Sequence, residues 1–189
     1  KKIIKNKFKK NNIISKNADL CSYNLPKEYF DFVYLNGIVH HFSNVKKGLE
    51  NCANSVKKNG YIWVYFYRSG TFKWFVCQMI RELIDKNNYE NFFRNIANIY
   101  ANGNTNDLIV SRIMDDFYAP YIHLYSFSNY LDFMQNLGFK KHAIINSSSE
   151  KDIDHQKLHH SSIIVFKKDT NSKISNKKSL NILDPKNSI

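Results

Sequence analysis

Polar side chains stand just after two of the apolar runs in the first third of the sequence. Asp19 follows one run, Asn36 and Gly37 follow the next, and the pair His40 and His41 comes close behind. A carboxylate and an amide can bind the polar groups of a ligand, and glycine lets a ligand approach the backbone closely. Two adjacent imidazoles could suggest a metal, but no third ligand stands at metal spacing, so no metal site is expected.

A second group of reactive side chains lies in the middle of the chain and is rich in phenols. The group could orient a small polar ligand or take its proton. It consists of Tyr67, Arg68, Asp115, Asp116, Tyr118, Tyr121, His123 and Tyr125. The alternative is a lid of helices and loops packed by aromatic side chains. A third group, His155, His159 and His160, lies in a polar stretch that favours a surface loop over a metal site.

The spacing of apolar residues predicts the elements that position the first group. Short strands are expected at 13–19, 30–36 and 61–67, with a helix over 45–58 that Asn59 and Gly60 would close. Alternation of strand, helix and strand is typical of a parallel sheet with crossovers. The strands are almost wholly apolar, which predicts helices on both faces of the sheet. Ligands of such sheets bind outside the carboxyl ends of the strands, where Asp19 and Asn36 fall.

The later part of the chain is expected to be helical before it returns to strands. Helices are predicted at 72–86, 89–101, 108–114 and 129–137, the last with Ser128 as its N-cap and Gly138 after its end. Strands are predicted at 139–146 and 161–167, paired antiparallel, and 1–12 is expected to be the end of a surface helix. The expected class is therefore α/β, with a helical insertion before the last two strands.

Composition narrows the possible classes of protein. The 189 residues are 43% hydrophobic and 15% aromatic, which is typical of a folded chain, and no apolar run is long enough for a membrane helix. Three widely spaced cysteines favour a reducing cytoplasm. The net charge of +12 is concentrated in lysines near both ends and favours solvated tails. The alternative is a basic nucleic-acid-binding module without catalytic activity that uses Trp63, Trp74 and Tyr89; their spacing looks buried, so nucleic acid is not the expected partner.

Five short motifs follow one another in a specific order: Asn17–Leu20, Leu25–Pro26, Phe30–Val33, Asn36–His41 and Val56–Gly60. Together they resemble the middle of class I, Rossmann-like methyltransferases that use S-adenosylmethionine, closest to the small-molecule group. The resemblance is good over residues 13–67 and weaker over 115–139. It implies an enzyme that transfers a methyl group to a small-molecule acceptor.

The resemblance also implies roles for individual residues. Asp19 would accept a hydrogen bond from the adenine amino group, and the amide of Leu20 would meet the ring edge. Asn36 and Gly37 would face the methionine part of the cofactor, and a neutral His41 would lie near the sulfonium. His41 and His123 are the candidate catalytic residues. Candidates for binding the acceptor are Tyr67, Arg68, Tyr118, Tyr121 and Tyr125.

One part of the family pattern is missing. A Rossmann-like site relies on a glycine-rich first turn, and no Gly-x-Gly-x-Gly occurs among the six glycines. We expect residues 1–169 to form a methyltransferase domain without its first two strands, which would lie between 13–19 and 30–36 in the sheet. We expect 170–189 to be a disordered basic tail, and cofactor binding by the chain alone to be weak or absent. A nicotinamide-dependent enzyme would need the same glycine motif and does not explain the His-His turn.

Overall fold

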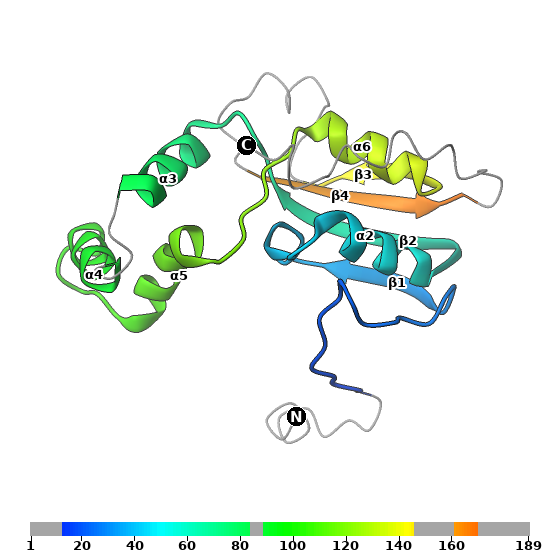
Figure 1. Ribbon diagram of the computed structural model, residues 1–189, viewed down its shortest axis with the longest axis horizontal. Coiled ribbons are helices and arrows are strands. Elements are labelled where there is room, and N and C mark those ends of the chain that lie inside the picture. Colours follow the sequence, from blue (N-terminus) through cyan, green and yellow to red (C-terminus); the bar gives the residue numbers. More distant parts are fainter. Residues whose placement is uncertain (1–12, 84–88, 146–160, 170–189) are drawn as a thin grey trace.

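A computed structural model describes residues 13–83, 89–145 and 161–169 of the chain (Figure 1). The elements in chain order are β1 (Phe30–Leu35), the short 3₁₀ helix η1 (Val39–His41), α2 (Val45–Ser55), β2 (Val56–Tyr67), α3 (Phe72–Leu83), α4 (Tyr89–Tyr100), α5 (Asp107–Tyr118), α6 (Phe127–Asn136), β3 (Phe139–Ile144) and β4 (Ser161–Lys168). The predicted helix at 1–12, the group of His155, His159 and His160, and the tail 170–189 lie outside the described residues. Every helix in the described part is too short or too polar to cross a membrane.

The strands form one four-stranded sheet in the order β1-β2-β4-β3. β1 and β2 are parallel and are joined by α2, while β4 pairs antiparallel with both β2 and β3. The predicted α/β class, the crossover, the antiparallel end and the helical insertion before the last two strands are therefore confirmed. Because β1 and β2 run in the same direction, their carboxyl ends lie at one edge of the sheet, which is the edge that α2 starts from.

One face of the sheet holds the main hydrophobic core. Ile62, Val64 and Phe66 alternate along β2 and are fully buried, as the two-residue period of a strand requires. Leu49 of α2 and Phe133 of α6 pack in the same cluster. Figure 1 shows α2 beside β1 and β2, and α6 beside β3 and β4. Both helices therefore cover this one face and hold the parallel pair in register.

The opposite face of the sheet differs from the sequence-based expectation. Phe32 and Tyr34 of β1 are 52% and 56% exposed, and the ring of Trp63 lies 4.5 Å from that of Tyr34. The prediction that helices cover both faces was wrong for the described residues. The physical reason is that α3, α4 and α5 pack on one another beyond the end of β2 instead of returning across the sheet (Figure 1).

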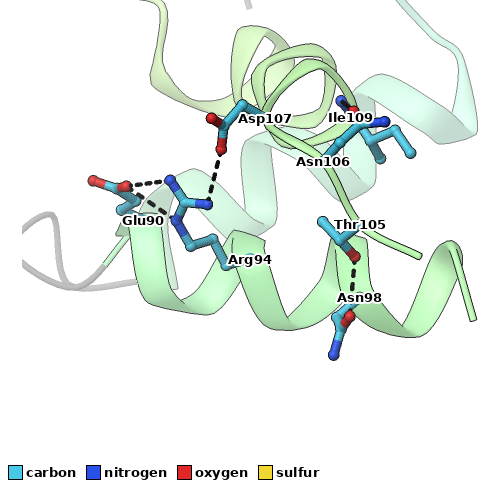
Figure 2. Close-up of polar contacts among 7 residues, drawn as sticks. All are labelled: Glu90, Arg94, Asn98, Thr105, Asn106, Asp107 and Ile109. Atoms are coloured by element: carbon cyan, nitrogen blue, oxygen red, sulfur yellow. Dashed lines mark hydrogen bonds and ion pairs between the residues drawn. The ribbon is translucent and has the colours of Figure 1, made fainter. Parts of the chain in front are cut away.

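Polar contacts fix the connection between α4 and α5. Arg94 of α4 pairs with Glu90 one turn earlier and with Asp107 at the start of α5, at 2.9 and 3.3 Å (Figure 2). The Asn106 side chain accepts a hydrogen bond from the amide of Ile109 at 3.0 Å and so caps α5. These contacts hold α4 and α5 as a helical pair that α3 joins.

The strand predicted at 13–19 is not present; this segment has no regular secondary structure. A strand is stable only where its backbone groups pair with a neighbour, and no strand among the described residues lies beside this segment. The sheet therefore begins with β1.

The helix predicted to reach Lys58 ends three residues earlier, at Ser55. Val56 is fully buried and extended, and it pairs with Phe30 of β1. Asn59 and Gly60 are consequently part of β2, not a helix cap. A Cβ on Gly60 would lie 2.9 Å from the carbonyl oxygen of Asp31, so glycine is needed here for close approach to the neighbouring strand.

The N-cap of α6 is Ser126 and not the predicted Ser128. The Ser126 hydroxyl accepts a hydrogen bond from the amide of Asn129 at 3.1 Å, and the Ser128 hydroxyl bonds to Ser126 at 2.9 Å. Both serines fit the N-cap preference, and the sequence alone does not decide between two positions that are two residues apart.

Candidate functional site

The loop after β1 leaves the carboxyl edge of the sheet through Asn36 and Gly37. Gly37 has φ +68°, which favours glycine, and no atom lies within 4 Å of where a Cβ would stand. The Asn36 side chain is exposed. The loop then forms η1, which carries His40 and His41 toward the end of β2. The space beside this turn is therefore open to a ligand.

The turn that follows Asp19 lies against the start of α2. The Asp19 carboxylate accepts a hydrogen bond from the amide of Cys21 at 2.9 Å, and the Cys21 thiol contacts the carbonyl of Asn44, the N-cap of α2, at 3.4 Å. The Asn51 side chain of α2 donates to the carbonyl of Leu20 at 2.8 Å. Because α2 starts at the carboxyl edge of the sheet, these contacts bring Asp19 and Leu20 to the edge that Asn36 and Gly37 occupy.

Asp19 also has a local structural role. Its second carboxylate oxygen accepts a hydrogen bond from the Ser22 hydroxyl at 3.3 Å, and its carbonyl accepts from the amide of Tyr23. An aspartate that binds its own turn in this way is a common loop device. The side chain is nevertheless exposed, so it has lone pairs left for a ligand.

His40 is completely buried beneath the turn. Its ring stacks on that of Tyr67 at 3.4 Å between centroids and lies 4.2 Å from the ring of His41. Neither ring nitrogen has a hydrogen-bond partner among the described residues. Burial, helped by repulsion from His41 and His123, lowers the pKa of His40 to about 2. His40 is therefore uncharged at neutral pH.

His41 and His123 tie the loop after β1 to the segment before α6. A carbonyl only accepts, so His41 Nδ1 donates to the carbonyl of Tyr121 at 2.9 Å, and His123 Nε2 donates to the carbonyl of Phe42 at 3.0 Å. The His123 amide also donates to the carbonyl of His40 at 3.0 Å. Burial is the main cause that lowers the pKa of His123. In a neutral His41 ring the bond to Tyr121 places the proton on Nδ1, which leaves the lone pair on Nε2.

The two candidate catalytic residues thus lie on facing segments, and both are mostly shielded from solvent, with 23% of the His41 side chain exposed. His41 Nε2 is buried and lies 4.0 Å from the carboxylate of Asp115, and His123 is 7% exposed. The fold brings the two histidines into one cluster, although they are 82 positions apart in the chain.

The candidate residues for acceptor binding divide by burial. Tyr67, Arg68 and Tyr125 are buried, and Arg68 forms a β-bridge with Tyr125 that attaches the segment before α6 to the end of β2. Tyr121 is 46% exposed. Tyr118 is the last residue of α5, and its side chain lies outside the described part of the chain. The ring of Tyr121 is therefore partly open to solvent, while Tyr67, Arg68 and Tyr125 form the buried wall of the candidate acceptor site.

A lysine that the sequence patterns did not single out lies beside this wall. Lys73 of α3 pairs with Asp116 at 2.7 Å, and its ammonium group lies over the ring of Trp74 at 4.7 Å. Burial first, and then the charge of Asp116, raise the pKa of Tyr67. The Tyr67 phenol is therefore neutral. Lys73 could not be predicted because a helical lysine is usually solvated and its partner lies 43 positions later.

A pocket opens on the other side of Trp74. Its volume is about 450 Å³, and its lining consists of Ser69, Gly70, Thr71, Phe72, Trp74, Phe75, Gln78 and Leu124. Sequence reasoning missed this pocket because half of its lining belongs to the helix predicted over 72–86, whose apolar residues were expected to pack in a core. No group of three metal-ligating side chains occurs among the described residues.

Comparisons with known proteins agree with this arrangement. Residues 1–64 match a family profile described as a methyltransferase domain. The structure of PKMT2 from Rickettsia typhi has a TM-score of 0.64 at 13% identity, over 93% of this chain and 42% of that one. PKMT2 in complex with AdoHcy gives 0.57 at 13% identity, over 93% and 43%. The YcgJ protein from Bacillus subtilis gives 0.50 at 12% identity, over 89% and 76%.

A search of curated proteins found no match to the chain. The chain spans less than half the length of PKMT2, and at these identities the structures show a shared fold. The match to the family profile includes the loops around Asp19 and Asn36. The similarity in fold to PKMT2 extends over 93% of the chain. Residues 1–64 are therefore similar to a methyltransferase domain, and the chain shares the fold of these solved structures.

Proposed function

We propose that the carboxyl edge of the parallel strands binds S-adenosylmethionine and serves methyl transfer to a small-molecule acceptor. One observation carries the proposal. The contact between Cys21 and Asn44 holds the Asp19 turn at the start of α2, and Asn36 and Gly37 lead from β1 to the same helix end. The two segments that the family uses for its cofactor therefore share one rim.

The chemistry of the rim fits a cationic cofactor. S-adenosylmethionine supplies, when bound, a methyl group on a positively charged sulfur. The nearest buried imidazole, His40, is uncharged because burial lowers its pKa to about 2, and burial also lowers the pKa of His123. Neutral rings, including the buried Tyr67, do not repel a cation. A protonated histidine at this place would oppose binding.

The roles of the rim residues follow from their positions. We propose that the exposed Asp19 carboxylate accepts the adenine amino hydrogen and that the Leu20 amide meets the ring edge. The open turn at Asn36 and Gly37 would face the methionine part, where the absence of a Cβ lets the ligand approach the backbone.

An acceptor that must lose a proton needs a base, and His41 is the better candidate of the two histidines. In the neutral tautomer that donates to Tyr121, Nε2 has the lone pair that could take the proton, and Asp115 at 4.0 Å would stabilise the imidazolium that results. Because that nitrogen is buried, the covering side chains must shift when the acceptor binds. His123 is the weaker base because its pKa is lowered, and we propose that it mainly positions the segment that carries Tyr121.

Ligand-observed NMR with AdoHcy and the full 189-residue chain tests the proposal. We expect weak binding, since the chain has no glycine-rich turn, and about tenfold weaker binding for Asp19→Ala, because a charge-assisted hydrogen bond contributes about 1.5–3 kcal/mol. Asp19→Asn keeps an acceptor for the Cys21 amide and separates loss of charge from loss of the turn.

The matched control is Asp31→Ala. Asp31 is an exposed aspartate paired with Lys57 near the start of β1, at the opposite edge of the sheet. No binding of AdoHcy at millimolar concentration, or an equal loss in the Asp19 and Asp31 variants, would contradict the proposed site.

A further inference from the structure

The pocket beside Trp74 is built where the chain leaves β2. Gly70 has φ +74°, which turns the chain sharply from the strand into α3. Trp74 then lies with its ring 4.1 Å from that of Tyr67. One wall of the pocket is therefore also in contact with the wall of the candidate acceptor site. A ligand in the pocket would lie close to the rim without contacting the residues proposed for the cofactor.

The lining of the pocket is suited to an uncharged ring. Its volume of about 450 Å³ is within the range of small-molecule sites, and its apolar lining consists of the exposed Phe72 and Phe75 and the nearly buried Trp74 and Leu124. No lining residue carries a formal charge. The ammonium group of the neighbouring Lys73 is paired with Asp116. An ionised ligand would lose its hydration there without gaining a counter-ion.

One polar group in the lining has no partner. Thr71 is 5% exposed, and its hydroxyl oxygen is buried without a hydrogen-bond partner among the residues that the structure describes. A buried hydroxyl of this kind costs free energy until something binds it. A ligand that carries one hydroxyl group would satisfy it and gain orientation, once the atoms that cover this oxygen shift.

The mouth of the pocket carries two large rings that water now contacts. Phe72 is 76% exposed and Phe75 is 65% exposed, although both are among the most apolar side chains of α3. Each aromatic ring that a ligand covers adds to binding in proportion to the apolar area removed from water. Exposed rings at the mouth and an unsatisfied hydroxyl inside are the features expected of a site for a small apolar molecule.

We propose that this pocket binds an uncharged aromatic compound with a hydroxyl group, which hydrogen-bonds to Thr71 and packs against the exposed rings of Phe72 and Phe75, next to Trp74. The further statement that this compound is the methyl acceptor rests on the proposed function. The binding itself does not, because none of the lining residues belongs to the cofactor rim.

Fluorescence quenching with 2-naphthol as the probe tests the proposal. The chain has two tryptophans, so a Trp63→Phe background leaves Trp74 as the reporter. We expect saturable quenching by 2-naphthol and about tenfold weaker binding in Thr71→Val, which keeps the shape of the side chain and removes its hydroxyl. Naphthalene, which has no hydroxyl, should bind both forms equally, and naphthalene-2-sulfonate should bind at least tenfold more weakly than 2-naphthol.

Thr105→Val is the matched control, because Thr105 lies in the connection between α4 and α5 and its hydroxyl bonds to Asn98 at 3.1 Å. Equal affinity of 2-naphthol for the Thr71 variant and its parent, both folded by circular dichroism, would overturn the proposal. So would sedimentation that shows a dimer which 2-naphthol does not dissociate, since a second copy would then cover the rings of α3. The assay contains no cofactor, so loss of AdoHcy binding in the Asp19 test leaves this result intact.

Discussion

The buried imidazole of His40 should make the stability of the fold fall as the pH is lowered. Burial lowers the pKa of His40 to about 2 in the folded chain, whereas an unfolded histidine has its ordinary value near 6.5. Below pH 6.5 the unfolded chain therefore binds a proton that the folded chain does not, and the unfolded state is favoured. The stabilisation by a neutral His40 is complete above about pH 7 and decreases steadily toward pH 2.

The size of this effect follows from the two pKa values. Each pH unit below 6.5 costs about 1.4 kcal/mol, so at pH 5 the loss from His40 alone is about 2 kcal/mol. That figure depends little on how low the folded pKa is, provided it lies well below 5. A loss of this size is a large fraction of the total stability of an ordinary domain.

Urea unfolding at pH 7.5 and pH 5.0 measures the difference. The variant is His40→Phe, which keeps a flat ring against Tyr67 and cannot be protonated. We expect the parent chain to lose about 2 kcal/mol more than this variant between the two pH values. His142→Phe, at an exposed position of β3, is the matched control and should lose as much as the parent. An equal pH dependence in the parent and the His40 variant would refute the reasoning, because it would mean that His40 accepts a proton in the folded state.

Two further substitutions test the packing that positions the rim. Gly48→Ala should lower the free energy of unfolding by about 1–3 kcal/mol, because the new Cβ would overlap the ring of Phe42, which precedes α2. The midpoint of urea unfolding measures this loss, and an unchanged midpoint would mean that the Phe42 ring moves freely. Ser126→Ala should cost about 1 kcal/mol by removing the cap bond to the amide of Asn129, measured by thermal unfolding against Ser128→Ala, which should cost less; the reverse order would restore Ser128 as the cap.

The elements that could be predicted from the sequence are those whose own apolar residues follow a strand or helix spacing. β1 and β2 are short apolar runs between polar turns, and α2 has its apolar residues at helical spacing, so each could be recognised alone. The boundary between α2 and β2 could not. Val56 fits both a helix and a strand by its apolar character, and only its pairing with Phe30 of the neighbouring strand decides.

The candidate site likewise has parts that a local sequence pattern indicates and parts that depend on long-range packing. Asn36 was proposed because residues after strands have a known place in a parallel sheet. Asp19 was proposed on the same argument, but the strand expected before it is not present, and contacts of its turn with α2 bring it to that edge instead. The pairing of Lys73 with Asp116 and the pocket around Thr71 depend on how α3 and α5 pack, and no local pattern encodes that. Groups that act through long-range packing are therefore the part of a site that a single sequence conceals.

The cluster of His40, His41 and His123 connects the stability of the chain with its proposed chemistry. His123 binds the loop after β1 through two backbone carbonyls, and His41 binds the opposite segment through the carbonyl of Tyr121. A carbonyl accepts a hydrogen bond from a neutral imidazole as well as from a protonated one, so these bonds alone do not keep His40 and His123 uncharged. Burial does, because it lowers the pKa of both His40 and His123. The low pKa values that would admit a cation at the rim are therefore a consequence of the same packing that closes the loop, and a substitution that opens this packing should weaken cofactor binding and acid sensitivity together.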